Sequence, residues 1–241
     1  MKIRDLREFT SARVNLGCSG CALPIAEVLK LQLAQVSARQ AVHAKLDASR
    51  LALDVNSVCQ DLIFVCSRAP DRVTYLRRPD LGRELNPDSR SLLLQKRGRF
   101  DAVFVLADGL SASALQAHAP GVIKASLRLL NPDDWRLAPF VVVEQARVAI
   151  GDEIGHCLGA ALSIVLIGER PGLSCSDSLA IYLTWNPRPG LTDAARNCIS
   201  NIHDDGLSYP VAAHKLAFLM HESRRRKLSG VELKEDAKAL T

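Results

Sequence analysis

Residues 166–173 bring together side chains that can hold a ligand. The segment reads Leu-Ile-Gly-Glu-Arg-Pro-Gly-Leu, so Glu169 and Arg170 follow an apolar run and precede a proline and a glycine. If the run is a strand of an open α/β sheet, both charges lie at its carboxyl end, where such sheets bind their ligands. A carboxylate there accepts hydrogen bonds and a guanidinium donates them. We therefore interpret the end of this strand as a binding site.

A second candidate, Asp108 followed by Gly109, also comes directly after an apolar run. Its carboxylate can bind a ligand at the same edge of the sheet, but an aspartate satisfied within its own turn is an equally good interpretation. The sequence contains neither Gly-x-Gly-x-x-Gly nor Gly-x-x-x-x-Gly-Lys-Ser/Thr, the loops that hold dinucleotides and nucleoside triphosphates. No Ser, His and Asp order stands out either. The sequence does not indicate a self-contained active site, and we name no catalytic residue.

The seven cysteines are odd in number and scattered, which indicates free thiols in a reducing cytosol rather than a disulfide framework. Cys18 and Cys21 alone have a spacing typical of a metal site. A structural zinc site takes four ligands, however, and no second Cys-x-x-Cys or His-x-x-x-His pair follows. We favour a glycine-containing turn at these two cysteines over a metal site, and we predict no metal ligand.

Composition and charge exclude several classes of protein. With 241 residues, 48% of them hydrophobic and 24% charged, the chain has the profile of a globular protein with a substantial core. No apolar run approaches the roughly 20 residues of a membrane span, and none follows the charged start as in a signal peptide. The net charge is +5, but the basic run at 224–227 suits the end of an amphipathic helix, where cations complement the helix dipole. We expect neither membrane insertion nor nucleic-acid binding.

A long helix is expected near the start of the chain, to about residue 46. Pro24 is placed like a first-turn proline. After it, Ile25, Leu29, Leu33 and Val36 recur at the spacings of one buried helical stripe.

The next segment is expected to be less regular. A short apolar run at 62–66 is a candidate early strand. Prolines at positions 70, 79 and 87 then predict a loop-rich stretch that wraps a neighbouring protein.

From residue 100 onward, short apolar runs alternate with helical segments, which is typical of βαβ units and a mostly parallel sheet. The candidate strands are residues 100–107, 140–143, 161–167 and 179–185. Residues 147–150 are a candidate hairpin partner for the second of them. We predict an α/β protein with a helical, loop-rich domain at 1–98 and a Rossmann-like domain at 99–241, whose mostly parallel sheet is the middle of three layers.

Further motifs surround residues 166–173 in a fixed order. They are 9–14 (Phe-Thr-Ser-Ala-Arg-Val), 75–83 (Tyr-Leu-Arg-Arg-Pro-Asp-Leu-Gly-Arg), 107–111 (Ala-Asp-Gly-Leu-Ser), 177–182 (Asp-Ser-Leu-Ala-Ile-Tyr), 196–202 (Arg-Asn-Cys-Ile-Ser-Asn-Ile) and 206–209 (Gly-Leu-Ser-Tyr). In order and spacing the set resembles the small (light) subunit of ethanolamine ammonia-lyase, from about residue 9 to about residue 230. The resemblance implies a part in the adenosylcobalamin-dependent conversion of ethanolamine to acetaldehyde and ammonia.

The resemblance also implies that three residues contact the cofactor, adenosylcobalamin. Glu169 would accept hydrogen bonds from the corrin amides, Cys198 would pack its small side chain or its backbone against the cofactor, and Val148 would add backbone and apolar contact. The alternatives are an ion pair between Glu169 and Arg170, a buried core cysteine and an ordinary strand valine.

Residues next to these three are expected to hold the loops in shape: Arg170, Asn197 and Asn201. Pro171 fixes its own backbone and disfavours helix at the residue before it, so the loop should be stiff before a ligand arrives. In the family, cobalamin keeps its own nucleotide base below the cobalt, so no side chain here is expected to bind the metal. The sequence also lacks the Asp-x-His-x-x-Gly motif that supplies a histidine to cobalt in other cobalamin proteins.

The resemblance further implies a partner, the large subunit. In the family it binds the substrate and the adenosyl group, and it forms a hexamer of large-small pairs with the light subunit. We therefore expect the chain to be inactive alone. Related light subunits usually carry an arginine where Cys18 stands; if that arginine docks the partner or a ligand, this chain has lost a charged contact. Because the chain begins close to its first motif, without the extension associated with a bacterial microcompartment, we expect it in the cytoplasm, with the microcompartment as the alternative.

Two other functions stay open at the level of the sequence. One is a stand-alone Rossmann-like enzyme that acts on a nucleotide or a small anion, which activity of the isolated chain would support. The other is an interaction protein whose segment 75–90 docks another chain, which assembly without cobalamin dependence would support.

Overall fold

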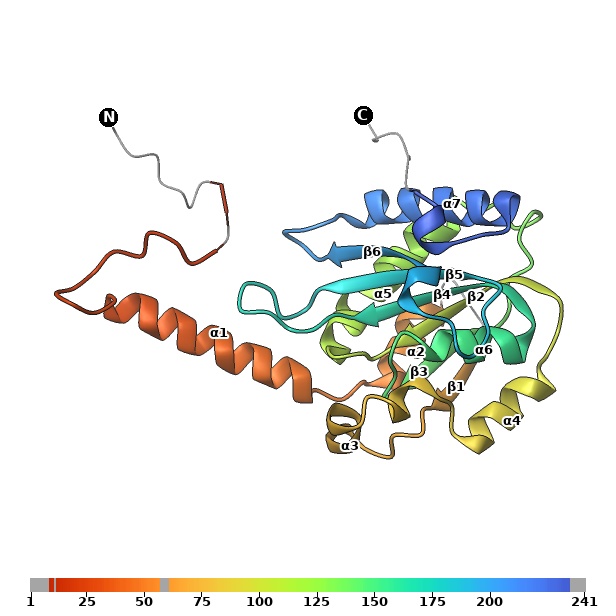
Figure 1. The fold of residues 1–241 in the computed structure, drawn as a ribbon, viewed down its shortest axis with the longest axis horizontal. Helices are drawn as coiled ribbons and strands as arrows, with labels where there is room; N and C mark the ends of the chain where they lie inside the picture. Colours follow the sequence, from red (N-terminus) through yellow and green to blue (C-terminus); the bar gives the residue numbers. More distant parts are fainter. Residues whose placement is uncertain (1–8, 11, 57–60, 235–241) are drawn as a thin grey trace.

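A six-stranded sheet in the order β1-β3-β2-β4-β5-β6 forms the centre of the computed structural model, which describes residues 9–10, 12–56 and 61–234 (Figure 1). The strands are β1 (Leu62–Cys66), β2 (Phe100–Ala107), β3 (Phe140–Glu144), β4 (Ala160–Gly168), β5 (Leu179–Trp185) and β6 (Arg196–Ile202). β1, β3, β2 and β4 run parallel, and β5 and β6 extend the sheet as antiparallel strands. The predicted α/β fold with a mostly parallel sheet is confirmed.

The apolar runs located five of these six strands to within one residue at each end. Almost every residue of β2, β3 and β4 is buried, because helices cover both faces of the sheet. Strand β6 was not predicted, because it is mostly polar and only Arg196, Ile199 and Ile202 of its residues are buried. β1 lies before the expected domain boundary near Gly98 but pairs with β3, so the first part of the chain contributes a strand to this sheet.

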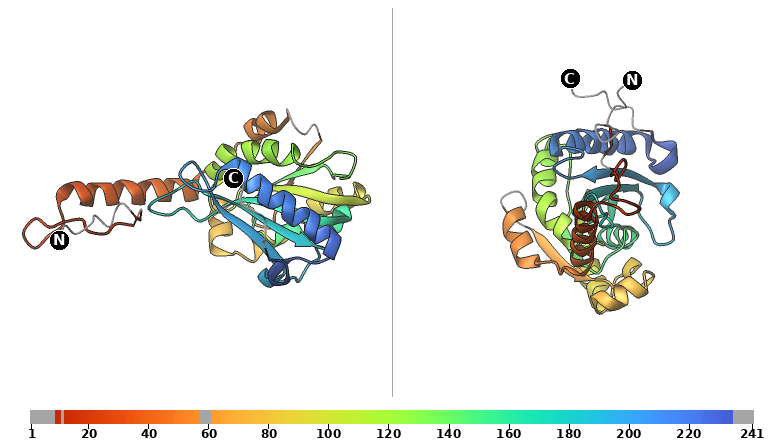
Figure 2. Two further views of the ribbon diagram at one scale, coloured as in Figure 1. Left: turned by 90° about the horizontal axis from the view of Figure 1, so that it is seen from above. Right: turned by 90° about the vertical axis from the view of Figure 1, so that its left-hand side faces the viewer.

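Most of the helices in the described ranges cover the two faces of the sheet, whereas the first projects from the body (Figures 1 and 2). The helices are α1 (Ile25–His43), α2 (Ala48–Asn56), α3 (Arg72–Arg77), α4 (Pro87–Gln95), α5 (Ala112–Leu127), α6 (Ile150–Leu158) and α7 (Tyr209–Arg226), with short 3-10 turns at Leu81–Arg83, Asp193–Ala195 and Gly230–Glu232. α2, α5 and α7 form one apolar core with the sheet, and α4 and α6 form a second core on the opposite face. None of the helices in these described ranges is long and apolar enough to cross a membrane.

Helix α1 projects away from the rest of the molecule (Figure 2). We call four of its apolar residues, which share one face, the α1 stripe: Ile25, Leu29, Leu33 and Val36, which are 78, 58, 68 and 52% exposed. The prediction that this stripe is buried is wrong. The helix meets the body near its end, where Arg72 Nε donates a hydrogen bond to the Val42 carbonyl (2.8 Å). Periodicity shows which residues share a face but not what covers that face.

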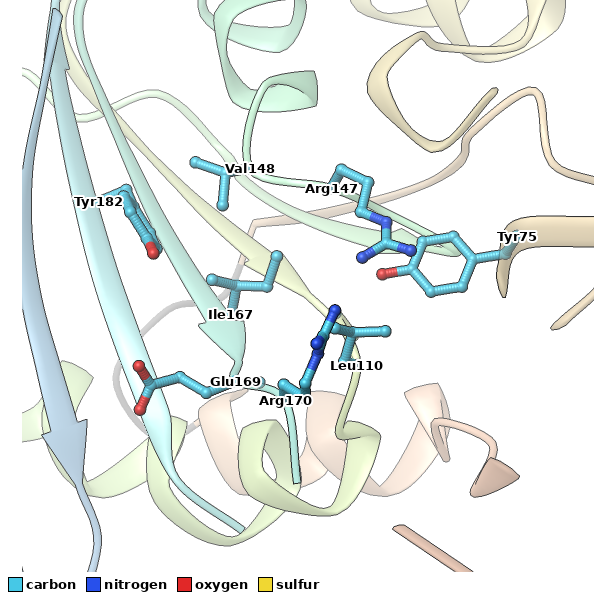
Figure 3. A pocket seen from close by; sticks show the side chains of 10 residues that line it. Tyr75, Leu110, Arg147, Val148, Ile167, Glu169, Arg170 and Tyr182 are labelled. Carbon is cyan, nitrogen blue, oxygen red and sulfur yellow. The ribbon is translucent and has the colours of Figure 1, made fainter. Parts of the chain in front are cut away.

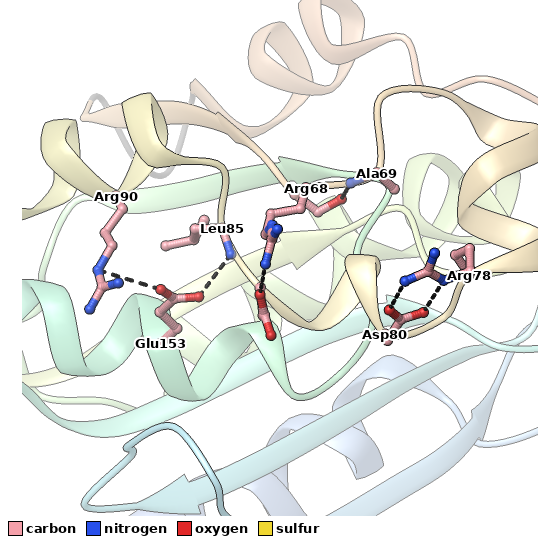
Figure 4. A network of polar contacts seen from close by, with 9 residues as sticks. Arg68, Ala69, Arg78, Asp80, Leu85, Arg90 and Glu153 are labelled. Atoms are coloured by element: carbon pink, nitrogen blue, oxygen red, sulfur yellow. Dashed lines mark hydrogen bonds and ion pairs between the residues drawn. The ribbon is translucent and has the colours of Figure 1, made fainter.

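The proline-containing segment before β2 is more regular than expected. Pro87 begins α4, a position where the missing N–H of proline costs nothing, and the Asn86 side chain caps the helix by accepting a hydrogen bond from its first turn. Glu153 of α6 binds this segment through both carboxylate oxygens (Figure 4). Its Oε2 accepts a hydrogen bond from Leu85 N (2.8 Å), and its Oε1 lies 3.6 Å from Arg90 Nε. The segment is therefore held against a helix of its own chain.

The basic run at 224–227 ends α7, as expected. Arg224 lies 3.4 Å from Asp101, Arg225 donates to Glu222 (2.9 Å), and Lys227 stops the helix in a left-handed conformation (φ 57°). Two of these charges are thus paired within the fold.

The turn expected at Cys18 and Cys21 is confirmed. Ser19 and Ala22 exchange two backbone hydrogen bonds (2.8 and 3.2 Å), and both cysteines are exposed.

Candidate functional site

A pocket opens at the carboxyl ends of β2, β3 and β4, on the face of the sheet that α6 covers (Figure 3). Its volume is about 190 Å³. The residues that line it are Tyr75, Gly109, Leu110, Arg147, Val148, Ile167, Gly168, Glu169, Arg170 and Tyr182. The segments that follow three neighbouring strands therefore meet at one hollow, and Val148 and Glu169 both lie in it.

Close contact between two loop backbones forms one wall of this pocket. The Gly168 carbonyl accepts a hydrogen bond from Leu110 N (3.0 Å), which joins the end of β4 to the turn after β2. The next residue, Ser111, accepts from Ala114 N (3.3 Å) to cap α5 and donates to the Ser176 carbonyl (3.0 Å). The two loops are thus tied to each other before any ligand binds.

Glu169 is held in place by the strands beside it. Its Oε2 accepts hydrogen bonds from Ser178 Oγ and from Asn201 N, the latter at 3.1 Å. Figure 3 shows the side chains of Glu169 and Arg170 pointing in different directions. The alternative of an ion pair between them is wrong for the part of the chain that the structure describes, where Glu169 uses neutral donors instead.

Val148 lies in the turn that joins β3 to α6 and is half-buried. The expected hairpin at 147–150 is wrong, because Gln145 takes a left-handed conformation (φ 56°) directly after β3 and α6 begins at Ile150. The turn is fixed by Arg147 N, which donates to the Gly82 carbonyl (2.7 Å). A strand valine is therefore not the right description of Val148.

Cys198 lies on β6 directly opposite Tyr182 of β5. Residues directly opposite each other on antiparallel strands point to the same face of the sheet. Cys198 therefore shares the face of the pocket but does not line it; it lines a neighbouring hollow of about 540 Å³ with Asn201 and Lys215. The cysteine is exposed, so the alternative of a buried core cysteine is wrong.

Although Cys198 as a residue is exposed, the surroundings of its sulfur raise the pKa of the thiol and favour the protonated form. Loss of solvation raises its pKa most, the negative charge of Glu169 raises it further, and a hydrogen bond with Tyr182 lowers it in part. Since the thiolate is the reactive form of cysteine, contact through the neutral side chain or the backbone suits Cys198 better than nucleophilic chemistry.

Of the two asparagines expected to hold the loops of the site, only Asn201 bonds a residue of the pocket. Asn197 Nδ2 donates to the Gly230 and Leu233 carbonyls (3.2 and 2.7 Å), which fixes the segment after α7 against β6. Asn201 is in a left-handed conformation (φ 64°) and presents its N–H to Glu169. Arg170 lines the pocket with an exposed side chain.

Asp108 is buried beneath the pocket rather than open to a ligand. Its Oδ1 accepts from Ala146 N (2.9 Å), and its Oδ2 lies 3.3 Å from Arg72 Nη1. Burial raises its pKa to about 6, although the Ala146 N–H and the Arg72 charge lower it in part. Of the two interpretations of Asp108, the satisfied turn aspartate is confirmed.

Three pocket residues carry no local signal that marks them as part of a site: Tyr75, Arg147 and Tyr182. Tyr75 is fully buried and donates from its hydroxyl to the Ala146 carbonyl (2.9 Å). Its ring centre lies 4.4 Å from the Arg147 guanidinium and 4.8 Å from that of Arg72. The two tyrosines fall inside quoted motifs, but a contact between residues about seventy positions apart leaves no local signal in the sequence.

Comparison of the sequence with known proteins identifies a family. Residues 1–234 match the family of the ethanolamine ammonia-lyase light chain. The small subunit of ethanolamine ammonia-lyase from Azotobacter vinelandii is 50% identical over 238 residues, which cover 97% of this chain and 88% of the relative. The small subunits from Pseudomonas fluorescens (strain Pf0-1) and Pseudomonas putida (strain GB-1) are each 48% identical, over 98% and 96% of this chain and 88% and 87% of the relatives. The chain belongs to the family of ethanolamine ammonia-lyase light chains.

Proposed function

We propose that this chain is the small subunit of an adenosylcobalamin-dependent ethanolamine ammonia-lyase, a carbon-nitrogen lyase that converts ethanolamine to acetaldehyde and ammonia. The family match over residues 1–234 carries this proposal. The part proposed for the chain is to hold one side of the cofactor through Val148, Glu169 and Cys198.

The unsatisfied polar atoms of the pocket suit the edge of a corrin. A corrin is a broad apolar disc edged with primary amides, which both accept and donate hydrogen bonds. Glu169 Oε2 is occupied by Ser178 and Asn201, but no described residue donates to its other oxygen, Oε1. Elsewhere in the pocket, Arg147 Nε is buried without an acceptor among the described residues. An amide-edged ligand supplies a donor to Glu169 Oε1 and an acceptor to the Arg147 guanidinium, which lines the pocket.

The size of the pocket supports a shared site. Its volume of about 190 Å³ lies below the roughly 300–1,000 Å³ of pockets that enclose a drug-sized ligand, and a corrin is larger than such a ligand. This chain can therefore hold an edge of the cofactor, and another protein surface must cover the remainder. We propose the large subunit as that partner; the hexamer of large-small pairs and the cytoplasmic location stay predictions.

When bound, the cofactor supplies homolysis of its cobalt–carbon bond. The residues of this chain bind and orient the corrin and exclude water from its edge. Because Glu169 and the turn with Val148 are already held by hydrogen bonds of the fold, little ordering is needed when the ligand arrives.

The proposed function is tested by acetaldehyde formation from ethanolamine and adenosylcobalamin, with the cognate large subunit in the presence and absence of this chain. We expect activity only when both chains are present. Full activity of the large subunit alone, or turnover by the isolated chain, would overturn the proposal.

Glu169→Gln is expected to weaken cobalamin retention by the assembled enzyme about 10-fold, because it removes the charge from one hydrogen-bonded acceptor. Glu169→Ala should weaken it further, since it also releases Asn201 N and Ser178. Equilibrium dialysis against cyanocobalamin measures both. Glu84→Ala is the control, because this carboxylate is exposed and outside the pocket; equal affinities for the variants at 169 and at 84 would remove Glu169 from the site.

The α1 stripe is the surface that we assign to the large subunit. Isolated apolar side chains are common on protein surfaces, but a row of four on a projecting helix marks an interaction site. Leu33 lines a third hollow, of about 280 Å³, together with Leu173 and Cys175. These two residues belong to the loop that leaves the cofactor pocket after Glu169, so the stripe is continuous with the proposed shared site.

Leu29→Ser and Leu33→Ser are expected to weaken assembly with the large subunit about 10-fold each, since a leucine that becomes buried contributes about 1.5 kcal/mol or more. Sedimentation of mixtures of the two subunits measures the association constant. Gln35→Ser is the matched control, because it is exposed on the same helix outside the stripe. Assembly unchanged in both leucine variants would assign the contact to another surface.

A further inference from the structure

The pocket contains a guanidinium whose hydrogen-bonding capacity the described fold does not use. Arg147 follows β3, and its backbone N–H is fixed by the Gly82 carbonyl. Its Nε is buried without a hydrogen-bond acceptor among the described residues, and none of the ion pairs found in that part of the chain includes Arg147. Its two Nη groups donate to no described residue either, and Arg147 lines the pocket, so these donors are available to a ligand.

Tyr75 holds this guanidinium in position. Its ring centre lies 4.4 Å from Arg147 Cζ, a distance typical of a cation stacked on an aromatic ring. Tyr75 itself is fully buried and anchored through its hydroxyl to the Ala146 carbonyl. Figure 3 shows Arg147 beside this ring, among the side chains that line the pocket. A side chain restrained in this way loses little conformational freedom when it binds.

Glu169, a second polar group of the pocket, limits which ligands can bind there. Glu169 offers an acceptor at Oε1, whereas Arg147 offers donors, so a ligand that satisfies both must carry donors and acceptors along one edge. A primary amide has both, whereas a phosphate has no N–H to give to Glu169. We propose that Arg147 donates a hydrogen bond to the carbonyl oxygen of a corrin side-chain amide, while Glu169 accepts from the N–H of another. This assignment rests on the proposed function.

The test uses the assembled enzyme and two corrin probes, cyanocobalamin and cobinamide. Cobinamide keeps the corrin amides but lacks the phosphate of the nucleotide tail. Arg147→Met is the main variant, because methionine keeps an unbranched apolar stem against Tyr75 and removes the donors. Arg147→Lys keeps the charge but loses the planar fork of donors. Equilibrium dialysis, read by the absorbance of the corrin, gives the affinities, and thermal unfolding shows that each variant is folded.

We expect Arg147→Met to weaken both probes about 10-fold, with Arg147→Lys between it and the unmodified chain. If Arg147→Met lost affinity for cyanocobalamin but not for cobinamide, Arg147 would contact the phosphate, and the amide assignment would be overturned. Unchanged affinity in Arg147→Met beside weakened affinity in Glu169→Gln would remove Arg147 from the site and leave the proposed function standing. Unchanged affinity in both variants would instead overturn the proposed cofactor site as a whole.

A third probe distinguishes an amide contact from a general effect of charge. Hydrolysis of one corrin side-chain amide gives a cobalamin monocarboxylate, and the isomers differ in which amide is changed. The isomer whose carboxylate faces Arg147 should bind the unmodified chain at least as tightly as cyanocobalamin, and Arg147→Met should abolish that advantage. If every isomer loses the same affinity in Arg147→Met, the guanidinium faces no individual amide and the proposal fails.

Discussion

Replacing Gly168 with alanine is expected to destabilise the fold by about 3 kcal/mol and to displace the end of β4. A Cβ at this position would lie 1.9 Å from the Ser111 carbonyl oxygen and 3.0 Å from that of Asp108. Both neighbours are backbone atoms, so no side-chain rotation can relieve the clash. Because Glu169 is the next residue, the same displacement should weaken cobalamin retention by the assembled enzyme.

Gly172→Ala is the matched control for this change. Gly172 lies in the same loop, but its added Cβ would first meet the Cys175 carbonyl oxygen at 3.3 Å, so the expected loss is within about 0.5 kcal/mol. Urea unfolding of the two variants gives the difference, and equilibrium dialysis against cyanocobalamin gives the effect on the site. Equal stabilities would show that the loops after β2 and β4 separate easily, which would contradict the close packing of this wall.

The strand that ends at Gly168 and the pocket beside it could both be predicted from the sequence. The apolar run before Gly168 predicted a buried strand, and the charged residues after it predicted a site at the strand end. Both follow from local pattern, because parallel strands are covered on two faces and their carboxyl ends share one edge of the sheet. Local pattern therefore located β4, Glu169 and the pocket together.

The errors have a different physical origin. The periodicity of α1 identified the four residues of the stripe correctly but not their exposure, because burial depends on which surface a helix meets. Strand β6 was missed because most of its side chains are polar, so no continuous apolar run marks it. The contact of Tyr75 with Arg147 joins residues distant in the sequence and becomes visible only when β1 and β3 pair. Non-local contacts thus account for what the sequence could not predict of the site.

The largest electrostatic effect is expected beneath the pocket, where Arg72→Met should destabilise the fold by about 3 kcal/mol at pH 8. Arg72 and Asp108 are both buried, with Nη1 and Oδ2 3.3 Å apart, and Nη1 also donates to the Gly109 carbonyl (2.8 Å). Removal of the arginine leaves a carboxylate buried without its compensating charge. Urea unfolding of the chain at pH 5 and pH 8 measures the loss.

Arg72→Met should destabilise the fold less at pH 5 than at pH 8, and the reason is the pKa of Asp108. Burial raises that pKa from 3.8 to about 6, so the folded chain binds an extra proton between these values. The free energy that this extra proton adds to folding is therefore fully present below about pH 4, and it is lost as the pH rises through about 6. Without Arg72 the pKa of Asp108 rises further, so the variant continues to lose stability near pH 8, where the unmodified chain has almost finished titrating Asp108.

A double variant shows whether charge or packing causes the loss. Arg72→Met with Asp108→Asn keeps an acceptor for Ala146 N but removes the buried charge, so it should recover at least half of the stability lost at pH 8. If instead Arg72→Met loses the same stability at both pH values and the second substitution recovers nothing, the arginine acts through its contact with the Tyr75 ring. The charge would then have no net effect, and the wall of the pocket beside Gly109 would depend on packing alone.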